Sequence, residues 1–247
     1  MSKWNSVAEK YNALVGDTGD IYHRTYINPV ILELLGSVKG EKILDLACGQ
    51  GYFSRILAKR GAKVTGIDKS EKLLKIAKAR VNEKSTDIEF YHSDSAKLNG
   101  LKNASFDIVV ANMSFHNIKN IKGTIKECSR VLKTNGRIIF SIPHPWHNIA
   151  ERKKRKGGWY LKVTGYKSLS SEKHFIKGLD TDMYHRPIDF YFHELFKNKF
   201  VISSFFEIAT KHHRGKIITD PGLKKHKKEI PSFLIVEGIK SYTAGVN

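Results

Sequence analysis

Short apolar segments alternate with longer amphipathic segments through the first 142 residues of the chain. The segment at 107–111 is apolar without a break from Ile108 onward, as expected of a strand buried on both faces. Between such segments, residues such as Leu73, Leu74 and Ala77 recur at helical spacing and predict helices that cover the sheet with one face. The predicted strands are 42–46, 63–67, 88–92, 107–111 and 137–142.

Two further regions flank this alternating core. Residues 3–35 predict two helices separated by the segment 16–19, and Pro29 is expected to kink or restart the second one. After residue 143 we expect an irregular, basic and aromatic-rich insertion that extends to about Tyr184. A helix over 186–198 follows it.

Two late strands, 199–208 and 232–237, leave no room for a crossover helix, so they are expected to pair antiparallel. The fold class that follows is α/β, with a Rossmann-like, doubly wound, mostly parallel seven-stranded sheet whose last strand is antiparallel. N-terminal helices and a basic insertion after strand five complete it. We expect a single domain over 1–247, made of N-terminal helices (1–38), a ligand-binding core (39–143) and a C-terminal part with the insertion (144–247).

A glycine turn follows the first predicted strand. Gly49 and Gly51 let the backbone approach a ligand closely, and the N–H groups of the next helix face the turn. The third glycine of a dinucleotide fingerprint is missing, and Asp45 would repel a pyrophosphate. Asp68, at the end of the second strand, is placed to accept hydrogen bonds from ribose hydroxyls. These features favour an adenosine compound with a positive centre and no phosphate.

Polar residues also follow the other strands of the predicted sheet. Asp45, Asp68, Asp94 and Asn112 each lie at or just past a predicted strand end. Ligands of open parallel sheets bind beyond the carboxyl ends of the strands. We therefore expect these four side chains to converge on one rim of the sheet.

At these positions the sequence resembles the class I S-adenosylmethionine-dependent methyltransferases, especially the group that acts on small molecules. The resemblance covers about residues 5–142 well and the tail more loosely. Ala47 replaces the first glycine of the family's D-x-G-x-G-x-G motif, which still keeps the turn small. The stretches that carry the resemblance, in order, are 45–51, 64–68, 93–96, 106–113 and 130–138.

The resemblance implies S-adenosylmethionine as the cofactor, and N-terminal helices with Tyr11, Tyr22 and Tyr26 that fold over it as a lid. It implies that Asp45 and the glycine backbone lie near the methionine moiety and that Asp68 binds the ribose. Asp94, Ser95 and Ala96 would contact the adenine edge, and Asn112 would line the wall beside the sulfonium. The cofactor residues that it implies are Asp45, Ala47, Gly49, Gly51, Asp68, Lys69, Asp94, Ser95, Ala96, Asn112 and Met113.

Methyl transfer needs a base only if the acceptor must lose a proton. The candidates near the predicted rim are His116, His144 and Tyr22, because histidine titrates near neutral pH and all three follow or face strand ends. Each could equally be an ordinary hydrogen-bonding or packing residue. No metal is expected, since Asp180 and Asp182 are isolated carboxylates and no cysteine–histidine zinc spacing occurs.

The net charge of +19 suggests an acidic partner. Basic runs at 152–156 and 224–228 interrupt the C-terminal part, and Trp159 and Tyr160 follow the first run. We predict transfer to an O or N atom of an anionic small molecule. RNA is the alternative acceptor, because basic residues interleaved with aromatic ones can bind nucleic acid. A lysine-rich solvated surface and a catalytically inactive cofactor-binding module are the remaining interpretations.

The residues that directly follow the predicted strand 107–111 bear on which acceptor is methylated. Base-methylating relatives commonly carry two prolines there, whereas this chain has Met113 and Ser114.

The chain contains no apolar run long enough to span a membrane and begins without a signal-peptide core. Its two cysteines, Cys48 and Cys128, are expected to be free thiols. We therefore expect a cytoplasmic monomer or homodimer with no membrane partner.

Overall fold

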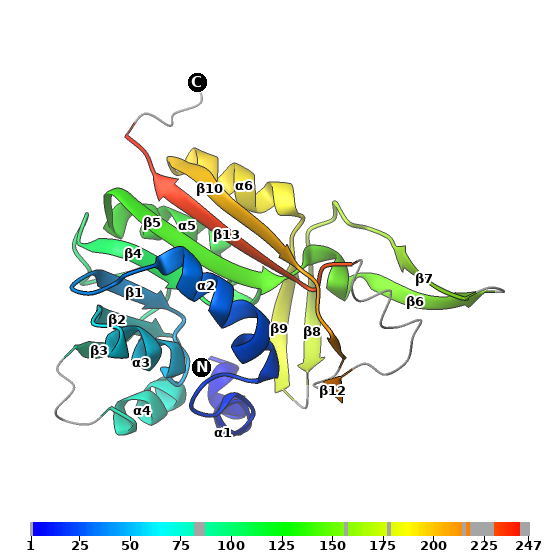
Figure 1. The fold of residues 1–247 in the computed structure, drawn as a ribbon, viewed down its shortest axis with the longest axis horizontal. Helices are drawn as coiled ribbons and strands as arrows, with labels where there is room; N and C mark the ends of the chain where they lie inside the picture. The colour runs from blue at the N-terminus through cyan, green and yellow to red at the C-terminus, as the bar shows by residue number, and fades with distance from the viewer. Residues whose placement is uncertain are drawn as a thin grey trace.

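One seven-stranded sheet organises the computed structural model of the chain (Figure 1). The structure describes residues 2–81, 87–155, 158–176, 179–213, 216–217 and 230–242. The strand order is β10-β13-β5-β4-β1-β2-β3. The strands are β1 (Lys42–Leu46), β2 (Lys63–Asp68), β3 (Ile88–His92), β4 (Phe106–Ala111), β5 (Leu132–Pro143), β10 (Phe200–Ile208) and β13 (Phe233–Lys240).

The direction of the strands confirms the predicted topology. The five strands from β1 to β5 are parallel, with β1 paired to both β2 and β4 in the middle of the sheet. The last strand, β13, lies between β5 and β10 and is antiparallel to both. The carboxyl ends of β1, β2, β3, β4 and β5 therefore meet at one rim of the sheet, where ligands of such sheets bind.

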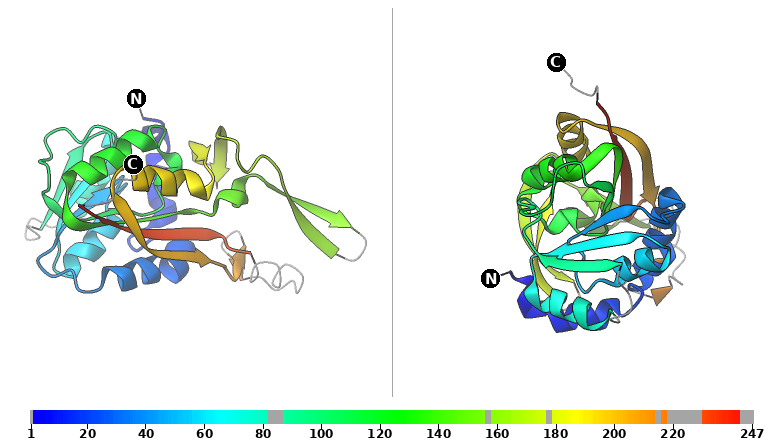
Figure 2. Two further views of the ribbon diagram at one scale, coloured as in Figure 1. Left: turned by 90° about the horizontal axis from the view of Figure 1, so that it is seen from above. Right: turned by 90° about the vertical axis from the view of Figure 1, so that its left-hand side faces the viewer.

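Helices cover both faces of the sheet, so it is doubly wound (Figures 1 and 2). Adjacent residues of β1 point to opposite faces: Ile43 packs in the cluster with Ile31 and Leu57, and Leu44 in the cluster with Ile125. Both β1 residues are fully buried, which explains why this strand is apolar on both faces. The helices are α1 (Trp4–Val15), α2 (Asn28–Leu35), α3 (Tyr52–Lys59), α4 (Glu71–Ala79), α5 (Ile121–Val131) and α6 (Ile188–Lys197).

Local signals placed several element ends correctly. Ser70 caps α4, because its hydroxyl accepts a hydrogen bond from the N–H of Leu73. The break near Pro29 is a short π-helix, η1 (His23–Ile27), which continues directly into α2. Strand β5, however, begins at Leu132, five residues before the predicted start at Arg137. Residues 133–136 therefore lie inside the strand, and Asn135 adopts a φ of +62° there.

The prediction of an irregular insertion after β5 was wrong. A short η3 turn (Pro145–Asn148) leads into two antiparallel hairpins. Strand β9 alternates buried with more exposed residues, a period of two that the sequence carries but that its polar residues hid. The hairpin of β6 and β7 projects from the body, whereas β9 contacts α1 (Figures 1 and 2). The hairpin strands are β6 (Ala150–Arg155), β7 (Gly158–Val163), β8 (Ser170–Ile176) and β9 (Leu179–His185).

The remaining described elements are short. They are η2 (Phe115–Asn117), β11 (His212–His213) and β12 (Lys216–Ile217). The second basic run, 224–228, lies outside the described residues. None of the helices in the described part of the chain combines the length and apolar character that crossing a bilayer requires.

Candidate functional site

A cavity of about 820 Å³ opens at the carboxyl ends of the parallel strands. This volume lies in the range of sites that enclose small molecules. Residues from the ends of β1, β2, β3 and β4 form one side, and residues 117–120 with Asp182 and Tyr184 of β9 form the other. Ser2, Lys3, Trp4 and Tyr11 of the N-terminal segment also line it. The polar strand ends thus converge on one rim, as the sequence predicts.

The glycine turn brings backbone to the edge of this cavity. Ala47, Gly49 and Gly51 have φ values of +57°, +58° and +76°, so the turn is left-handed at every second residue. A Cβ atom at Gly51 would lie 2.7 Å from Cζ of Phe90, which leaves no space for a side chain. A Cβ atom at Gly49 would lie 3.2 Å from Cε1 of Tyr11, on the cavity side. Gly51 therefore serves packing, whereas Gly49 exposes backbone to a ligand.

The carboxylate of Asp68 is tied to the glycine turn. Its Oδ2 atom accepts a hydrogen bond from the N–H of Gly49 at 2.9 Å, and its Oδ1 atom accepts one from the N–H of Ser70 at 2.7 Å. Burial raises the pKa of Asp68, and these backbone hydrogen bonds partly oppose that rise. The carboxylate is thus held rigidly in the cavity wall, with further lone pairs available to hydroxyl donors.

Asp45 lies behind the cavity wall rather than in it. Its Oδ2 atom accepts a hydrogen bond from Oγ of Ser54 at 2.5 Å. Only 2% of the residue is exposed, and burial raises its pKa to about 7. A second buried carboxylate, Asp68, adds to the rise. A cation bound in front of the glycine turn would favour the ionised form of Asp45.

Asp94 and Lys69 form an ion pair at the cavity edge. Nζ of Lys69 lies 2.7 Å from Oδ2 of Asp94, and Oδ1 of Asp94 accepts a hydrogen bond from the N–H of Ala96 at 3.0 Å. Burial alone would raise the pKa of Asp94, but these two donors outweigh burial and hold it below its usual value. Asp94 therefore stays ionised at neutral pH.

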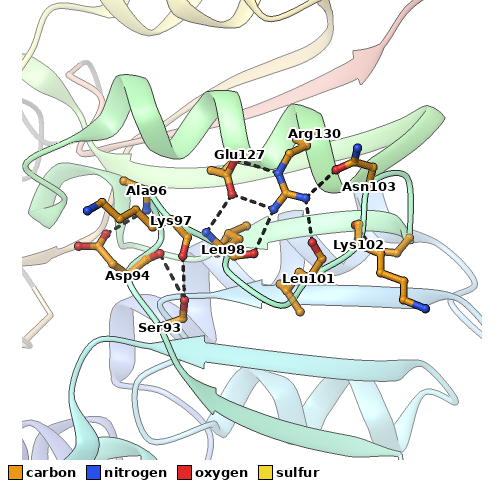
Figure 3. A network of polar contacts seen from close by, with 11 residues as sticks. Ser93, Asp94, Ala96, Lys97, Leu98, Leu101, Lys102, Asn103, Glu127 and Arg130 are labelled. Atoms are coloured by element: carbon orange, nitrogen blue, oxygen red, sulfur yellow. Dashed lines mark hydrogen bonds and ion pairs between the residues drawn. The ribbon is translucent and has the colours of Figure 1, made fainter.

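A polar network anchors the loop that carries Asp94 to helix α5 (Figure 3). Arg130 forms two hydrogen bonds with the carboxylate of Glu127, at 2.9 and 2.8 Å. The same guanidinium donates to the carbonyl oxygens of Leu98 and Leu101, and Glu127 accepts the N–H of Leu98 at 2.9 Å. Arg130 opens the fifth stretch of the family resemblance, and its role in the structure is to fix this loop.

The amide of Asn112 is engaged by three neighbouring elements. Nδ2 donates to Oδ1 of Asn28 and to the hydroxyl of Tyr52, both at 3.0 Å. Oδ1 accepts a hydrogen bond from Oγ of Ser141 at 2.9 Å, and the same Oγ accepts the N–H of Met113 at 2.8 Å. Asn112 thereby ties the start of α2, the start of α3 and β5 to the cavity wall.

The predicted cofactor residues gather around this cavity with three exceptions. Asp45, Gly51 and Ala96 do not line it; each supports a residue or turn that does. The partners Asn28, Tyr52 and Ser141 were missed, since nothing in their sequence context marks them. The residues that do line it are Ala47, Gly49, Asp68, Lys69, Asp94, Ser95, Asn112 and Met113.

None of the three predicted bases lines the cavity. His116 is buried in η2, and the ring of Tyr22 packs at 5.7 Å from that of Phe233. Nε2 of His144 lies 2.8 Å from Oε1 of Glu207, and burial lowers the pKa of His144 against the opposing effect of that carboxylate. Their catalytic role stays a prediction, and the cavity geometry lends it no support.

The N-terminal segment extends across the opening of the cavity. Nζ of Lys3 lies 2.6 Å from Oδ1 of Asp182, so the segment is linked across the opening to β9. Nδ2 of Asn117 donates to the carbonyl oxygen of Asp182 at 2.8 Å and fixes that strand to the loop after β4. On the other side, Oδ1 of Asn5 accepts a hydrogen bond from Oγ of Ser70 at 2.7 Å. Asp182, weighed in the sequence only as a metal ligand, thus takes part in closing the site.

Comparison with known proteins agrees with this geometry. Residues 44–140 match the family described as methyltransferase domain. An S-adenosylmethionine-dependent methyltransferase from Mesorhizobium loti is 25% identical, with a TM-score of 0.73, over 85% of this chain and 96% of that one. A putative S-adenosylmethionine-dependent methyltransferase from Listeria monocytogenes, 24% identical over 86% of this chain and 97% of its own, has the same fold with a TM-score of 0.68.

Relatives known from sequence cover less of the chain. A ubiquinone biosynthesis O-methyltransferase from Idiomarina loihiensis is 35% identical over 119 residues, which are 47% of this chain and 49% of that protein. An uncharacterised protein from Haemophilus influenzae is 37% identical over 121 residues, 47% of this chain and 48% of its own. The chain spans about half the length of the curated relatives it matches. It contains a class I S-adenosylmethionine-dependent methyltransferase domain, whose cofactor is S-adenosylmethionine.

Proposed function

We propose that this protein transfers the methyl group of S-adenosylmethionine to an O or N atom of an anionic small-molecule acceptor. The observation that carries the proposal is one continuous cavity of about 820 Å³ that joins the carboxylate-bearing strand ends to residues 117–120 and β9. Such a volume accommodates a nucleoside cofactor and a small acceptor together. The relatives named ubiquinone biosynthesis O-methyltransferases favour oxygen as the accepting atom.

We assign the strand-end carboxylates to the cofactor. Asp68 accepts hydrogen bonds from the ribose hydroxyls, supported by its rigid position beside Gly49. The loop of Asp94, Ser95 and Ala96 contacts the adenine edge, and its anchoring to α5 supports a fixed contact. Asp45 attracts the positive methionine end from behind the glycine turn.

Bound S-adenosylmethionine supplies an electrophilic methyl group, which an acceptor lone pair takes in an in-line displacement from sulfur. The protein's own contribution is to hold the acceptor against that methyl group and to exclude water, which can lower the barrier by several kcal/mol. Asn112 and Met113 line the cavity and are held in place by hydrogen bonds to Tyr52 and Ser141. Because none of the predicted bases lines the cavity, the favoured acceptor is one that ionises in solution.

The first basic run favours a small molecule over RNA as the acceptor. Most of it belongs to β6, on the hairpin that projects from the body, and the cavity is lined by other residues (Figure 1). The N-terminal segment and β9 also narrow the opening through the Lys3–Asp182 ion pair. A flipped nucleotide in a large RNA would have to enter past this contact.

The test is incubation of the protein with methyl-labelled S-adenosylmethionine and cell extract, separated into small-molecule and RNA fractions. We expect label in the small-molecule fraction and none when Asp68→Ala replaces the wild-type protein. Label in RNA alone would replace the proposed acceptor class. Cofactor binding without label in either fraction would contradict the proposed activity and favour an inactive binding module.

A further inference from the structure

A second cavity, of about 380 Å³, lies next to the first. The two share three wall residues, Lys119, Asn120 and Tyr184. The second cavity continues from this shared wall along the first turn of α5, the end of β9 and the start of α6. A ligand that fills the first cavity and extends past Lys119 therefore enters the second.

The second cavity is strongly positive. Lys119, Lys122 and Arg186 line it, and its described lining contains no Asp or Glu. Only 6% of Arg186 is exposed, and its guanidinium donates to the carbonyl oxygens of Ile118 at 2.7 Å and Lys119 at 3.1 Å. In the described part of the chain no carboxylate lies within 4.0 Å of this guanidinium, and its partners are backbone carbonyl oxygens and the rings of Tyr184 and Phe190. A buried charge without a counterion favours an anionic ligand.

The two lysines of the second cavity, Lys119 and Lys122, lie just before and within the first turn of α5. This helix has eleven residues, and Asn120 caps it by accepting the N–H of Gly123 at 3.1 Å. Lys122 is partly neutralised by Glu194 at 3.6 Å, whereas Lys119 has no ion-pair partner among the described residues. Lys119 is thus an exposed cation without an ion-pair partner in the described structure, at the junction of the two cavities, and the helix N-terminus adds to its field.

One ring nitrogen of the buried His185, in the same lining, has no hydrogen-bond partner in the described structure. His185 is 4% exposed, and its Nε2 atom lies 2.8 Å from the carbonyl oxygen of Tyr166, which requires Nε2 to carry the hydrogen. Its Nδ1 atom is buried without a hydrogen-bond partner in the described structure. With the hydrogen on Nε2, Nδ1 is a hydrogen-bond acceptor. Buried polar atoms are rarely left unpaired, so this acceptor marks a polar spot in the wall of the second cavity.

Apolar side chains complete the second cavity. The ring of Phe190 lies beneath both Lys122 and Arg186, with cation-to-centroid distances of 5.7 and 5.8 Å. Leu169 lines the outer side and is 63% exposed, although it is a large apolar residue. Such a mixture of cations and apolar surface suits an organic acid better than an inorganic anion.

We propose that the second cavity is the subsite for a carboxylate of the methyl acceptor, with Lys119 as the residue that selects for this charge. The inference rests on the proposed function. In this arrangement the accepting atom lies in the first cavity, the carboxylate lies beside Lys119, and an apolar portion of the acceptor covers Leu169 and Phe190. The acceptor is therefore an organic acid rather than a neutral or cationic compound.

The test uses 4-butylbenzoate as the probe and 4-butylbenzamide, which has the same shape without the charge, as its control. Binding is measured by calorimetry on the full chain saturated with S-adenosylhomocysteine. We expect the carboxylate to bind about tenfold or more tightly than the amide, as charge-assisted hydrogen bonds predict. Equal affinities, or no binding of the carboxylate, would overturn the proposal.

Two variant pairs localise the probe. Lys119→Gln is expected to weaken 4-butylbenzoate binding by roughly tenfold. Lys126→Gln removes the same charge from an exposed position of α5 outside both cavities and is expected to leave it unchanged. Leu169→Glu should abolish probe binding, whereas Leu169→Gln should not. Equal loss in both members of either pair would place the probe elsewhere and refute the subsite.

The same samples separate this proposal from the proposed function. Binding of S-adenosylhomocysteine and transfer of label into extract report on the methyltransferase activity, and Lys119→Gln should leave cofactor affinity unchanged. In the wild-type protein 4-butylbenzoate is expected to inhibit label transfer by competing with the acceptor. Label transfer that is insensitive to saturating probe would show that the carboxylate site is no part of the acceptor site, while the proposed activity would stand.

Discussion

The two sides of the main cavity are built by different means. The side that we assign to the cofactor, the cofactor side, consists of backbone and short side chains at the ends of β1 to β4, held by hydrogen bonds such as that from Gly49 to Asp68. The acceptor side consists of residues 117–120, β9 and the N-terminal segment, held together by the Lys3–Asp182 ion pair. An exposed ion pair between distant residues therefore contributes to the acceptor side, whereas buried hydrogen bonds hold the cofactor side.

This difference has an energetic consequence. The cofactor side belongs to the buried core, where a lost hydrogen bond to a carboxylate costs about 1.5–3 kcal/mol. The side chains of Lys3 and Asp182 are 49% and 37% exposed, so their ion pair contributes about 1 kcal/mol or less. The cofactor side should therefore be rigid before any ligand arrives, whereas the acceptor side can open at small cost and admit the acceptor.

Substitution of one carboxylate on each side is the strongest way to break this comparison. Asp68→Ala removes the proposed acceptor of the ribose hydroxyls and the acceptor of two backbone N–H groups, and we expect a loss in cofactor affinity of about 3 kcal/mol, or roughly 100-fold. Asp182→Asn, its counterpart on the other side, should change cofactor affinity by less than about twofold. Calorimetric titration with S-adenosylhomocysteine measures both, and similar losses in the two variants would show that the sides are not independent.

The pH dependence of stability isolates Asp45 on the cofactor side. Its pKa is raised to about 7 in the folded protein, above its ordinary value, so the folded state binds a proton more tightly than the unfolded chain. Stability from this group is present at low pH and is lost as pH rises through about 7. Between pH 5 and 8 we expect the free energy of unfolding to fall by about 2 kcal/mol from this cause.

Urea unfolding of wild type and Asp45→Asn across that pH range tests the assignment. The variant carries no titrating group at this site, so the fall should largely disappear. Asp107→Asn is the control, because its carboxylate lies at the opposite ends of the strands with a lowered pKa. An equal slope in wild type and Asp45→Asn would rule out Asp45 as its origin.

Substitution of Ala47 in the glycine turn is expected to have the smallest effect on stability among the changes considered for the cofactor side. It holds a φ of +57° at the position where the family pattern has glycine, and a left-handed alanine costs about 1–2 kcal/mol. Ala47→Gly should therefore stabilise the protein by about 1 kcal/mol and raise its melting temperature by roughly 2–4 °C. Asn135→Gly, at a φ of +62° on an exposed position of β5, should have a smaller effect because asparagine tolerates this conformation. Thermal unfolding that ranks the two in the opposite order would contradict this account.

Particular residues show how far the sequence could predict the site. Strand β1 has the predicted bounds, because four consecutive buried residues after Lys42 leave a strong local signal. The turn at Gly49 and the carboxylate of Asp68 were predictable for another reason, because the strand ends of a parallel sheet must share a rim. The hairpins of the insertion were missed because their alternation is masked by charged residues, and burial in β9 depends on contact with other elements.

The sequence by itself determined the sheet, its topology and the cofactor rim, because periodic burial and glycine geometry are local properties of the chain. Only the tertiary structure decided that Asn112 is held by Asn28, Tyr52 and Ser141, and that Asp182 closes the cavity. It also decided that the guanidinium of Arg186 lies beside Lys119. These contacts join residues separated by long stretches of chain, and no local pattern records which of them the folded protein brings together.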